Sequence, residues 1–382
     1  MDTLQSWFGL KEQHNDFSIE TDTDASLFFA RHELNQRLQS ILRRSFRSGS
    51  PPKMVLYGDW GVGKTHTMRH MEYVIANTDD FKATVVFVEL PDIVSKSTFQ
   101  VAHSALLDAL GFERAKRWVV QFQARYSADA HDRIRALTQS GDIAGAFDNM
   151  LAYGEGSRIA WDWLRGVPLA AGDARLVGLP PGLYQSNQLV KVLEVFGRLS
   201  QEVDGKLLVF MLDEATKLDR VTNPDAVAHW TNALKLLADQ KSKEVGFVLS
   251  GSWIDPNEMA LPLQDQQVMT RFGEPNYIQL VSLDEAETII FLNALLEEWV
   301  DTRSRAAILE AHGGEADGEA IAPTSFPFTK PALEIAARYT CRQGGITTPR
   351  DIQITLDDLL NRAIDDGRHV VSSRYISALV GA

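Results

Sequence analysis

The sequence predicts an α/β fold, in which a parallel sheet with its helices is followed by a small all-α domain. Short apolar runs between residues 53 and 281 alternate with segments of helical periodicity. This alternation is typical of a parallel sheet. From Leu283 onward helical segments dominate, and we expect no further strands. The chain has 382 residues, which is enough for one large or two ordinary domains.

The expected strands are short apolar runs. The run at residues 84–90 is apolar almost throughout, which is typical of a strand buried on both faces of its sheet. A short run at residues 54–57 precedes a glycine-rich segment, and a further run begins at Leu207. The remaining expected strands are residues 245–250 and 277–281.

Helices are expected where apolar residues recur every three or four positions. Residues 27–46 show this spacing at Leu34, Leu38, Ile41 and Leu42. The segment 313–320, with its acidic and glycine residues, is expected to be a flexible loop. The other expected helices are 99–110 and 188–203, followed in the tail by 283–300, 330–341, 349–366 and 372–379.

Residues 113–190 form a long insertion between two strands. A crossover between parallel strands needs only about a dozen residues, and well over a hundred separate Leu90 from Leu207. We therefore expect an inserted group of helices, closed by a loop with Gly182 and the pair Pro180-Pro181. The expected helices are 113–126, 131–138, 143–153 and 158–164.

The segment KMVLYGDWGVGKTHTMR, residues 53–69, contains the pattern G-x-x-x-x-G-K-[ST] between an expected strand and an expected helix. This is the context that a phosphate-binding P-loop requires. Glycines let the backbone turn its N–H groups toward one point, and the helix N-terminus adds the positive end of its dipole. The alternative is a chance match. The motif residues are Gly58, Asp59, Trp60, Gly61, Val62, Gly63, Lys64 and Thr65.

A P-loop makes specific predictions for two side chains. The Lys64 ammonium would reach the β- and γ-phosphates of a bound nucleotide, and the Thr65 hydroxyl would ligate Mg²⁺. ATP and Mg²⁺ are therefore the expected cofactors.

An acidic pair, Asp213 and Glu214, follows the apolar run that begins at Leu207. Open α/β sheets bind their ligands at the carboxyl ends of strands. Asp213 would hold Mg²⁺ through water, and Glu214 would orient and polarise the attacking water. The alternative is that the pair only caps the next helix.

Composition narrows the class of protein. The net charge of −13 disfavours nonspecific coating of nucleic acid, although a local basic patch is still compatible with it. Cys341 is the single cysteine, which rules out an intrachain disulfide and a cysteine-rich metal site. The N-terminus has no signal-peptide pattern, and no apolar run reaches the ~20 residues needed to span a bilayer. We expect a cytoplasmic protein without a membrane partner.

Residues 1–25 are expected to form an arm whose apolar patch, Trp7, Phe8 and Leu10, docks on another surface. His66 and His70 lie four apart on the expected P-loop helix, but no third metal ligand is evident, so we do not expect a metal there.

Two basic clusters are candidates for contact with nucleic acid, although charge runs of this kind are usually solvated surface. The first cluster is Arg43, Arg44, Arg47 and Lys53, and the second is Arg114, Lys116 and Arg117 beside Trp118.

Several features follow one another along the chain: the P-loop, the long crossover, Leu212-Asp213-Glu214-Ala215, the strand with a polar end, Thr270-Arg271-Phe272 and the helical tail. In this order they resemble an AAA+ ATPase. The resemblance covers roughly residues 25–380. Within that family the chain is similar to the initiator-like branch, which includes origin-recognition ATPases, TnsC-type transposition regulators and ATPases of phage-defence systems such as BREX. Residues 29–34 resemble the F-x-x-R-x-x-E-L pattern of that branch, and residues 161–178 resemble the insertion of the defence ATPases.

The resemblance implies three further roles. Ser250, at the end of its strand, matches sensor 1, with Ser252 as the alternative. Arg271 matches the arginine finger that reaches the ATP of a neighbouring subunit, and an arginine suits this because it stays charged and binds two phosphate oxygens. Arg350 matches sensor 2 at the start of a lid helix. The alternatives are a surface salt bridge for Arg271 and a simple helix-end residue for Arg350.

The resemblance implies an ATPase domain at residues 26–282 and a helical lid domain at 283–382. It implies a homo-oligomer, ring or filament, that acts as a motor or regulatory switch in a DNA transaction of the defence or mobile-element type, with partner proteins of the same system. The few residues after Arg350 leave no room for an appended winged helix, which disfavours a sequence-specific replication initiator. Alternatives are a nucleotide-dependent protein-interaction switch that does not bind DNA, and a monomeric P-loop kinase, which would leave Arg271 unexplained.

Overall fold

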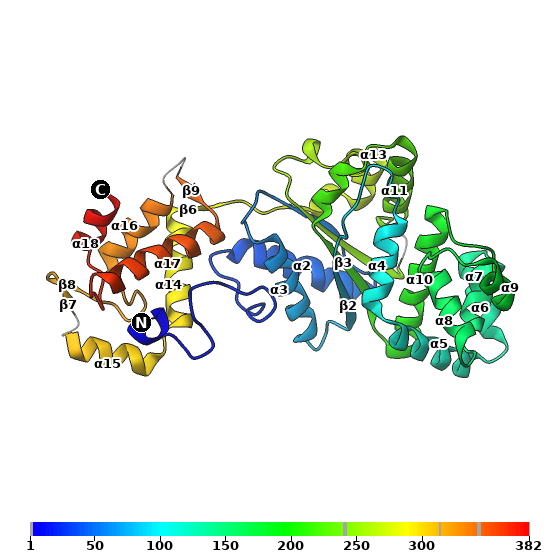
Figure 1. Cartoon of the computed structure of the whole chain (residues 1–382), viewed down its shortest axis with the longest axis horizontal. Helices are drawn as coiled ribbons and strands as arrows, with labels where there is room; N and C mark the ends of the chain where they lie inside the picture. The colour runs from blue at the N-terminus through cyan, green and yellow to red at the C-terminus, as the bar shows by residue number, and fades with distance from the viewer. Residues whose placement is uncertain (1–2, 240–242, 313–314, 342–344, 382) are drawn as a thin grey trace. The chain divides into compact units, whose positions relative to one another are not determined.

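The computed structural model describes residues 3–239, 243–312, 315–341 and 345–381 (Figure 1). The chain forms two compact units, each assembled from separate segments. The sheet unit comprises Leu38–Gly58 and Met71–Gln279. The helical unit comprises Met1–Arg37, Asp59–His70 and Leu280–Ala382.

The sheet unit is built on a five-stranded parallel sheet with the strand order β2-β3-β4-β1-β5. Every residue of β1, β3 and β4 is buried, as expected for strands covered on both faces. The predicted α/β fold class is thus confirmed. The strands are β1 (Lys53–Tyr57), β2 (Ala83–Glu89), β3 (Leu207–Asp213), β4 (Val245–Gly251) and β5 (Tyr277–Gln279).

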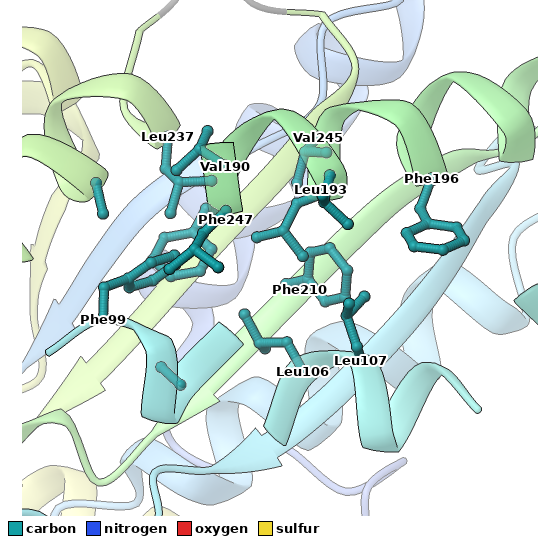
Figure 2. Packing of buried hydrophobic residues seen from close by; sticks show 14 of the residues in the cluster. Phe99, Leu106, Leu107, Val190, Leu193, Phe196, Phe210, Leu237, Val245 and Phe247 are labelled. Carbon is teal, nitrogen blue, oxygen red and sulfur yellow. The ribbon is translucent and has the colours of Figure 1, made fainter. Parts of the chain in front are cut away.

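One face of the sheet packs against three helices, α4 (Gln100–Leu110), α10 (Ser186–Asp204) and α11 (Pro224–Leu237). Figure 2 shows Phe210 of β3 and Phe247 of β4 among side chains from these helices, including Leu193. Both phenylalanines are fully buried, so this layer fixes the two strands against the helices.

The inserted helices lie together beside α10 (Figure 1). Their core includes the fully buried Trp118 and Trp163. The helix expected at residues 143–153 ends earlier, and a turn follows it up to Gly154, which has φ 80°. A further short helix, α9, was not expected. The helices are α5 (Phe112–Tyr126), α6 (Asp129–Thr138), α7 (Gly141–Asn149), α8 (Glu155–Leu164) and α9 (Ala171–Val177).

Two long helices flank β1 in the sequence, α2 (His32–Ser48) and α3 (Lys64–Ala76). The helix expected to start at residue 27 starts only at His32, because Ala30 has a left-handed backbone with φ 55°. Between β3 and β5 lie the shorter elements η1 (Ala215–Arg220), η2 (Pro256–Glu258), α12 (Leu261–Gln264), α13 (Gln266–Phe272) and η3 (Glu274–Asn276).

The helical unit has its own core. Phe8, Trp299, Phe328 and Leu360 are fully buried in it, so the N-terminal segment packs together with the C-terminal helices. Trp7 stacks on His369 with ring centroids 3.9 Å apart. The helices are α1 (Leu4–Phe8), α14 (Glu285–Trp299), α15 (Thr302–His312), α16 (Lys330–Thr340), α17 (Pro349–Asp365) and α18 (Ser373–Val380).

The expectation that strands stop at Leu283 was wrong in detail. Two short antiparallel pairs occur in the helical unit: β6 (Leu283–Asp284) with β9 (Ile346–Thr347), and β7 (Glu315–Ala316) with β8 (Glu319–Ala320). The segment expected to be a flexible loop therefore forms a hairpin over 315–320, because Asp317-Gly318 adopts the positive φ angles that a tight hairpin turn requires. Residues 313–314 of that expected loop lie outside the described residues.

No helix in the described part of the chain is both long and apolar enough to cross a membrane.

Candidate functional site

The segment of residues 58–65 begins where β1 ends and leads directly into α3. Gly61 and Gly63 have φ angles of 75° and 86°, which side chains rarely tolerate. The first N–H groups of α3, starting at Lys64, have no partners within the helix itself. This segment therefore has the strand–turn–helix form of a phosphate-binding loop.

Lys64 is the first residue of α3, and it is 9% exposed. Its Nζ donates a hydrogen bond of 2.7 Å to the backbone carbonyl oxygen of Asp59. The ammonium is thus folded back over the loop, where a bound anion would meet it.

The helix α17 begins against the loop. A Cβ atom on Gly61 would lie 2.8 Å from Thr348 Oγ1 and 3.2 Å from Arg350 Cβ, so only glycine allows this approach. Thr348 is the N-cap of α17, and its Oγ1 accepts a hydrogen bond of 3.2 Å from the Asp351 backbone N–H. Arg350 is exposed, and no hydrogen bond or ion pair of its side chain occurs within the described residues. The structure therefore places Arg350 beside the loop.

Asp213 and Ser250 end neighbouring strands on the same face of the sheet. Leu212 pairs with Leu249, so the next residues, Asp213 and Ser250, are neighbours. Leu212 and Leu249 point into the core beneath α4 and α10, and alternation along a strand turns Asp213 and Ser250 to the opposite face.

Both side chains are buried, since Asp213 is 5% exposed and Ser250 is not exposed at all. Ser250 Oγ has no hydrogen-bond partner among the described residues. An unsatisfied buried hydroxyl costs about 1–3 kcal/mol, so it is a feature that needs a reason. Ser252, the alternative, lies beyond β4, and its N–H donates to Thr216 Oγ1 at 2.6 Å.

Glu214 follows Asp213 in a left-handed backbone conformation, with φ 58° and ψ 30°. For a residue with a side chain, this conformation costs roughly 1 kcal/mol or more, and such residues cluster at functional sites. Glu214 occupies the N-cap position of η1, but its side chain makes no cap hydrogen bond. The alternative that the acidic pair merely caps this helix therefore finds no support at Glu214.

Arg271 lies near the end of α13, in the sheet unit. Its Nη1 donates a hydrogen bond of 2.7 Å to the backbone carbonyl oxygen of Lys235 on α11. Arg271 lines a surface hollow of about 610 Å³ together with Asn187 and His229. The side chain is therefore held at the surface of the sheet unit.

The first basic cluster is reduced to three arginines. Arg43, Arg44 and Arg47 are exposed on α2 and line a surface hollow of about 640 Å³. Arg43 donates to the neutral Gln39 Oε1 at 2.9 Å, and neither Arg44 nor Arg47 has an ion-pair partner in the described part of the chain. Lys53 was wrongly included: it is 3% exposed and donates to the Asp239 carbonyl, and its burial lowers its pKa to about 8.

The second basic cluster is engaged within the chain. Arg117 pairs with Asp204 at 3.8 Å, and the Trp118 indole N–H donates to the same carboxylate at 2.7 Å. Lys116 Nζ donates to Ser157 Oγ at 3.2 Å. Most of this cluster therefore stabilises the inserted helices.

His66 and His70 are hydrogen-bonded to backbone carbonyl oxygens. His70 Nδ1 is hydrogen-bonded to the Ala25 carbonyl oxygen at 2.9 Å, and burial lowers the pKa of both histidines. Among the described residues, no group of three or more His, Cys, Asp or Glu side chains that could hold a metal ion is present.

The sequence reasoning missed Thr348 and the N-terminal residues that contact α3. Thr348 could have been found, because Thr348 with Asp351 three residues later fits the helix-start pattern [ST]-x-x-[DE]. The contacts of residues 17–28 had no such local signal, since they join parts of the chain that are distant in sequence.

A parallel sheet in which a glycine-rich loop leaves β1 and acidic residues end β3 is a P-loop-type α/β architecture. No protein-family model matches the chain, and no curated protein matches it.

Solved structures give likenesses at low sequence identity. Cdc6p from Pyrobaculum aerophilum is 16% identical with a TM-score of 0.44, and the match covers 89% of this chain and 64% of Cdc6p, less than two thirds of its length. The Aeropyrum pernix ORC2 protein is 14% identical with a TM-score of 0.48, over 93% and 68% of the two chains. The Thermotoga maritima RuvB Holliday junction branch migration motor is 12% identical with a TM-score of 0.40, over 94% and 71%. At sequence identities of 16% or less and TM-scores below 0.5, these likenesses carry no conclusion about this chain.

Proposed function

We propose that this chain is an AAA+ ATPase that binds and hydrolyses ATP with Mg²⁺ at the subunit interfaces of a homo-oligomer. It would act as a motor or regulatory switch in a DNA transaction of the defence or mobile-element type. One observation carries the ATPase proposal: the glycine-rich loop leaves β1 at the same edge of the sheet where the buried Asp213 and Ser250 end β3 and β4.

ATP binding would begin at the loop of residues 58–65. Backbone N–H groups and the α3 N-terminus would receive the phosphates. The Lys64 ammonium, which donates to the Asp59 carbonyl oxygen, would transfer hydrogen bonds to phosphate oxygens when ATP binds.

The residues present fit Mg²⁺ by donor type. Mg²⁺ prefers oxygen ligands and usually keeps several waters, and the Thr65 hydroxyl and the Asp213 carboxylate are oxygen donors of this kind. When bound, Mg²⁺ would neutralise charge on the phosphates. Asp213 would contribute a carboxylate whose place is fixed by the paired strands around it.

Hydrolysis needs an oriented water. The Glu214 carboxylate would hold and polarise this water, since it makes no cap hydrogen bond to η1 that would compete. The Ser250 hydroxyl, which lacks a partner within the described residues, would donate a hydrogen bond to the water or to the γ-phosphate.

Arg271 would act as an arginine finger toward the nucleotide of a neighbouring subunit, and its surface position is compatible with that role. Arg350 would contact the nucleotide of its own subunit, as its place beside Gly61 suggests. Together these arginines would link nucleotide binding to assembly into a ring or filament.

We further propose that DNA binds at Arg43, Arg44 and Arg47. These exposed charges are a local exception on a chain of net charge −13. Guanidinium groups without a carboxylate partner are well suited to a phosphate backbone. The engaged second cluster is the weaker candidate.

A triple variant tests the DNA proposal. Replacing Arg43, Arg44 and Arg47 by Glu should weaken ATP-dependent binding to duplex DNA and flatten its log–log salt dependence by about two to three units. Fluorescence anisotropy with labelled DNA at several salt concentrations measures both quantities.

The matched control replaces Arg114, Lys116 and Arg117 by Glu, which changes the net charge by the same amount. This control should leave the salt dependence unchanged. Absence of DNA binding by the parental protein at low salt with ATP would end the DNA proposal.

The second candidate function is a nucleotide-dependent switch that signals to a protein and does not bind DNA. One observation favours it: Tyr153, in the turn between α7 and α8 of the insertion, is 99% exposed. An exposed aromatic residue is a common anchor in protein interfaces. Partner proteins of the same system would then contact the insertion.

We propose functional domains that differ from the compact units. Residues 26–282 would form the ATPase domain, with the insertion at 113–190, residues 283–382 the lid domain, and residues 1–25 an arm. The compact units instead group the loop at 59–70 with the arm and the C-terminal helices.

A further inference from the structure

The N-terminal segment contacts α3 through an ion pair and a hydrogen bond. Asp22 Oδ1 lies 2.8 Å from Arg69 Nε. The carbonyl oxygen of Ala25 lies 2.9 Å from His70 Nδ1. The side chains of Arg69 and His70 are therefore anchored on residues that precede them by more than forty positions.

A second pair of contacts strengthens this attachment. The carbonyl oxygen of Leu27 lies 2.5 Å from His66 Nε2. The Phe28 ring stacks on His70 with centroids 4.4 Å apart and planes at 12°. Because burial lowers the pKa of both histidines, the rings are neutral near pH 7, and stacking with Phe28 needs no charged imidazole.

The same segment contacts α17. The N–H of Phe17 donates to Asp357 Oδ1 at 3.1 Å, and the N–H of Ile19 donates to Gln353 Oε1 at 3.1 Å. Phe17 is fully buried in the core of the helical unit. Residues 17–28, here called the clamp segment, thus bind α17 at one end and α3 at the other.

The two helices joined by the clamp segment also meet at the P-loop. α3 starts at Lys64, and α17 starts next to Gly61. Thr348 and Arg350 of this region lie close to where a Cβ atom on Gly61 would be. Gln353 lies one turn after Arg350 on α17. All these residues belong to the helical unit. Any movement of α17 away from the loop would therefore strain the contacts of the clamp segment.

We infer that the clamp segment positions Arg350 beside the P-loop, so that Asp22 and Phe28 act as positioning residues that slow the release of a bound nucleotide. The inference rests on the proposed ATP binding. Residues far in sequence from the P-loop would then set how long ATP stays bound, since they hold α17, the helix that carries Arg350.

Phe28→Ala tests the inference most directly, because Phe28 is only half-buried and its ring contributes through the stack on His70. We expect a fluorescent ATP analogue to dissociate about fivefold faster, which corresponds to the loss of about 1 kcal/mol. Phe28→Tyr keeps the ring and should restore the parental rate. Stopped-flow displacement by excess ATP measures the rate.

Asp22→Asn tests the other contact. The Asp22 side chain is 72% exposed, so its ion pair is weak, and we expect dissociation to be about twofold faster. Glu20→Gln is the matched control, because it makes the same charge change on the clamp segment at a side chain with no partner in the described part of the chain. It should leave the rate unchanged.

Hydrogen exchange separates the two proposals. In nucleotide-free protein, the amides of the first turn of α17 should exchange faster in Phe28→Ala than in the parental chain. Unchanged exchange in α17, or unchanged dissociation in both Phe28→Ala and Asp22→Asn, would overturn the positioning role. Absence of binding of the analogue by the parental chain would overturn the proposed ATP binding, and α17 exchange would still decide whether the clamp segment holds that helix.

Discussion

Two parts of the candidate site are positioned in different ways. Asp213 and Ser250 end paired, fully buried strands, so the sheet fixes their places. Arg271 and Arg350 lie on helices near the surface, and each depends on a few local contacts. The sheet therefore holds Asp213 and Ser250 in fixed places, whereas the proposed roles of Arg271 and Arg350 depend on helices that fewer contacts hold.

The largest expected effect concerns an arginine. Arg271→Ala should cut ATP hydrolysis by roughly 10³–10⁵ while leaving nucleotide binding nearly intact, because a trans arginine finger acts on the transition state. Steady-state ATPase assays and binding titrations measure the two quantities. Mixing Arg271→Ala with Lys64→Ala protein should restore some activity, because mixed interfaces combine an intact loop with an intact finger.

Arg271→Lys serves as the structural control. Lysine can still donate to the Lys235 carbonyl oxygen but cannot bind two phosphate oxygens in a fork, so activity should stay low while the fold is preserved. If the Arg271→Ala variant were monomeric and kept full ATPase activity, Arg271 would have no role toward a neighbouring subunit.

The next effect concerns the fixed part of the site. Lys64→Ala should weaken ATP binding by about a hundredfold, because charge-assisted hydrogen bonds to phosphate are lost. Isothermal titration with ATP and Mg²⁺ measures the change. Lys82→Ala is the control, because Lys82 is exposed and lies just before β2, at the amino ends of the strands. This variant should bind ATP as the parental chain does. Equal losses in the two variants would contradict the P-loop assignment.

The smallest effect tests the scaffold behind the fixed residues. His103 on α4 is fully buried, is hydrogen-bonded to the Leu164 carbonyl oxygen at 2.7 Å, and has its pKa lowered by burial to about 4. Between pH 6.5 and pH 4 the unfolded chain binds the extra proton, so stability rises with pH in this window and is lost as pH falls through it. One pH unit below 6.5 should remove about 1 kcal/mol of unfolding free energy.

Urea unfolding at pH 7, 6 and 5 measures this dependence. The control is His103→Gln, which can still donate to the Leu164 carbonyl oxygen but has no group that titrates in this range. The difference in slope between the two proteins isolates His103. Identical slopes would show that His103 does not couple stability to pH.

Much of the sheet could be predicted from the sequence, because continuous apolar runs such as the one ending at Asp213 mark strands buried on both faces. The strand–turn–helix form around residues 58–65 could equally be predicted, since a strand and a helix bound its glycines. Helix ends were harder to predict. Local periodicity extended α2 back to residue 27, but Ala30, with its left-handed backbone, prevents the helix from starting there.

The arrangement of the helical unit could not be predicted. The hairpin at 315–320 depends on a two-residue Asp317-Gly318 turn within a stretch that looks merely acidic and flexible. The pairing of Arg69 with Asp22 and the approach of Thr348 to Gly61 are contacts between distant segments, which periodicity and motifs do not encode. Whether Lys53 was exposed also depended on packing, because a lysine at the start of a buried strand looks the same in sequence as one on a surface.

Glu214→Gln is the variant that tests the central claim most directly, because glutamine keeps the size and the left-handed backbone of Glu214 and removes only the carboxylate. The control is Glu89→Gln, at the end of the neighbouring β2 strand, where Glu89 pairs with Lys217 at 2.7 Å. Single-turnover hydrolysis of ATP should stop in Glu214→Gln while ATP binding persists, and Glu89→Gln should hydrolyse ATP at the parental rate. Hydrolysis by Glu214→Gln at the parental rate would contradict the claim that the end of β3 orients the attacking water.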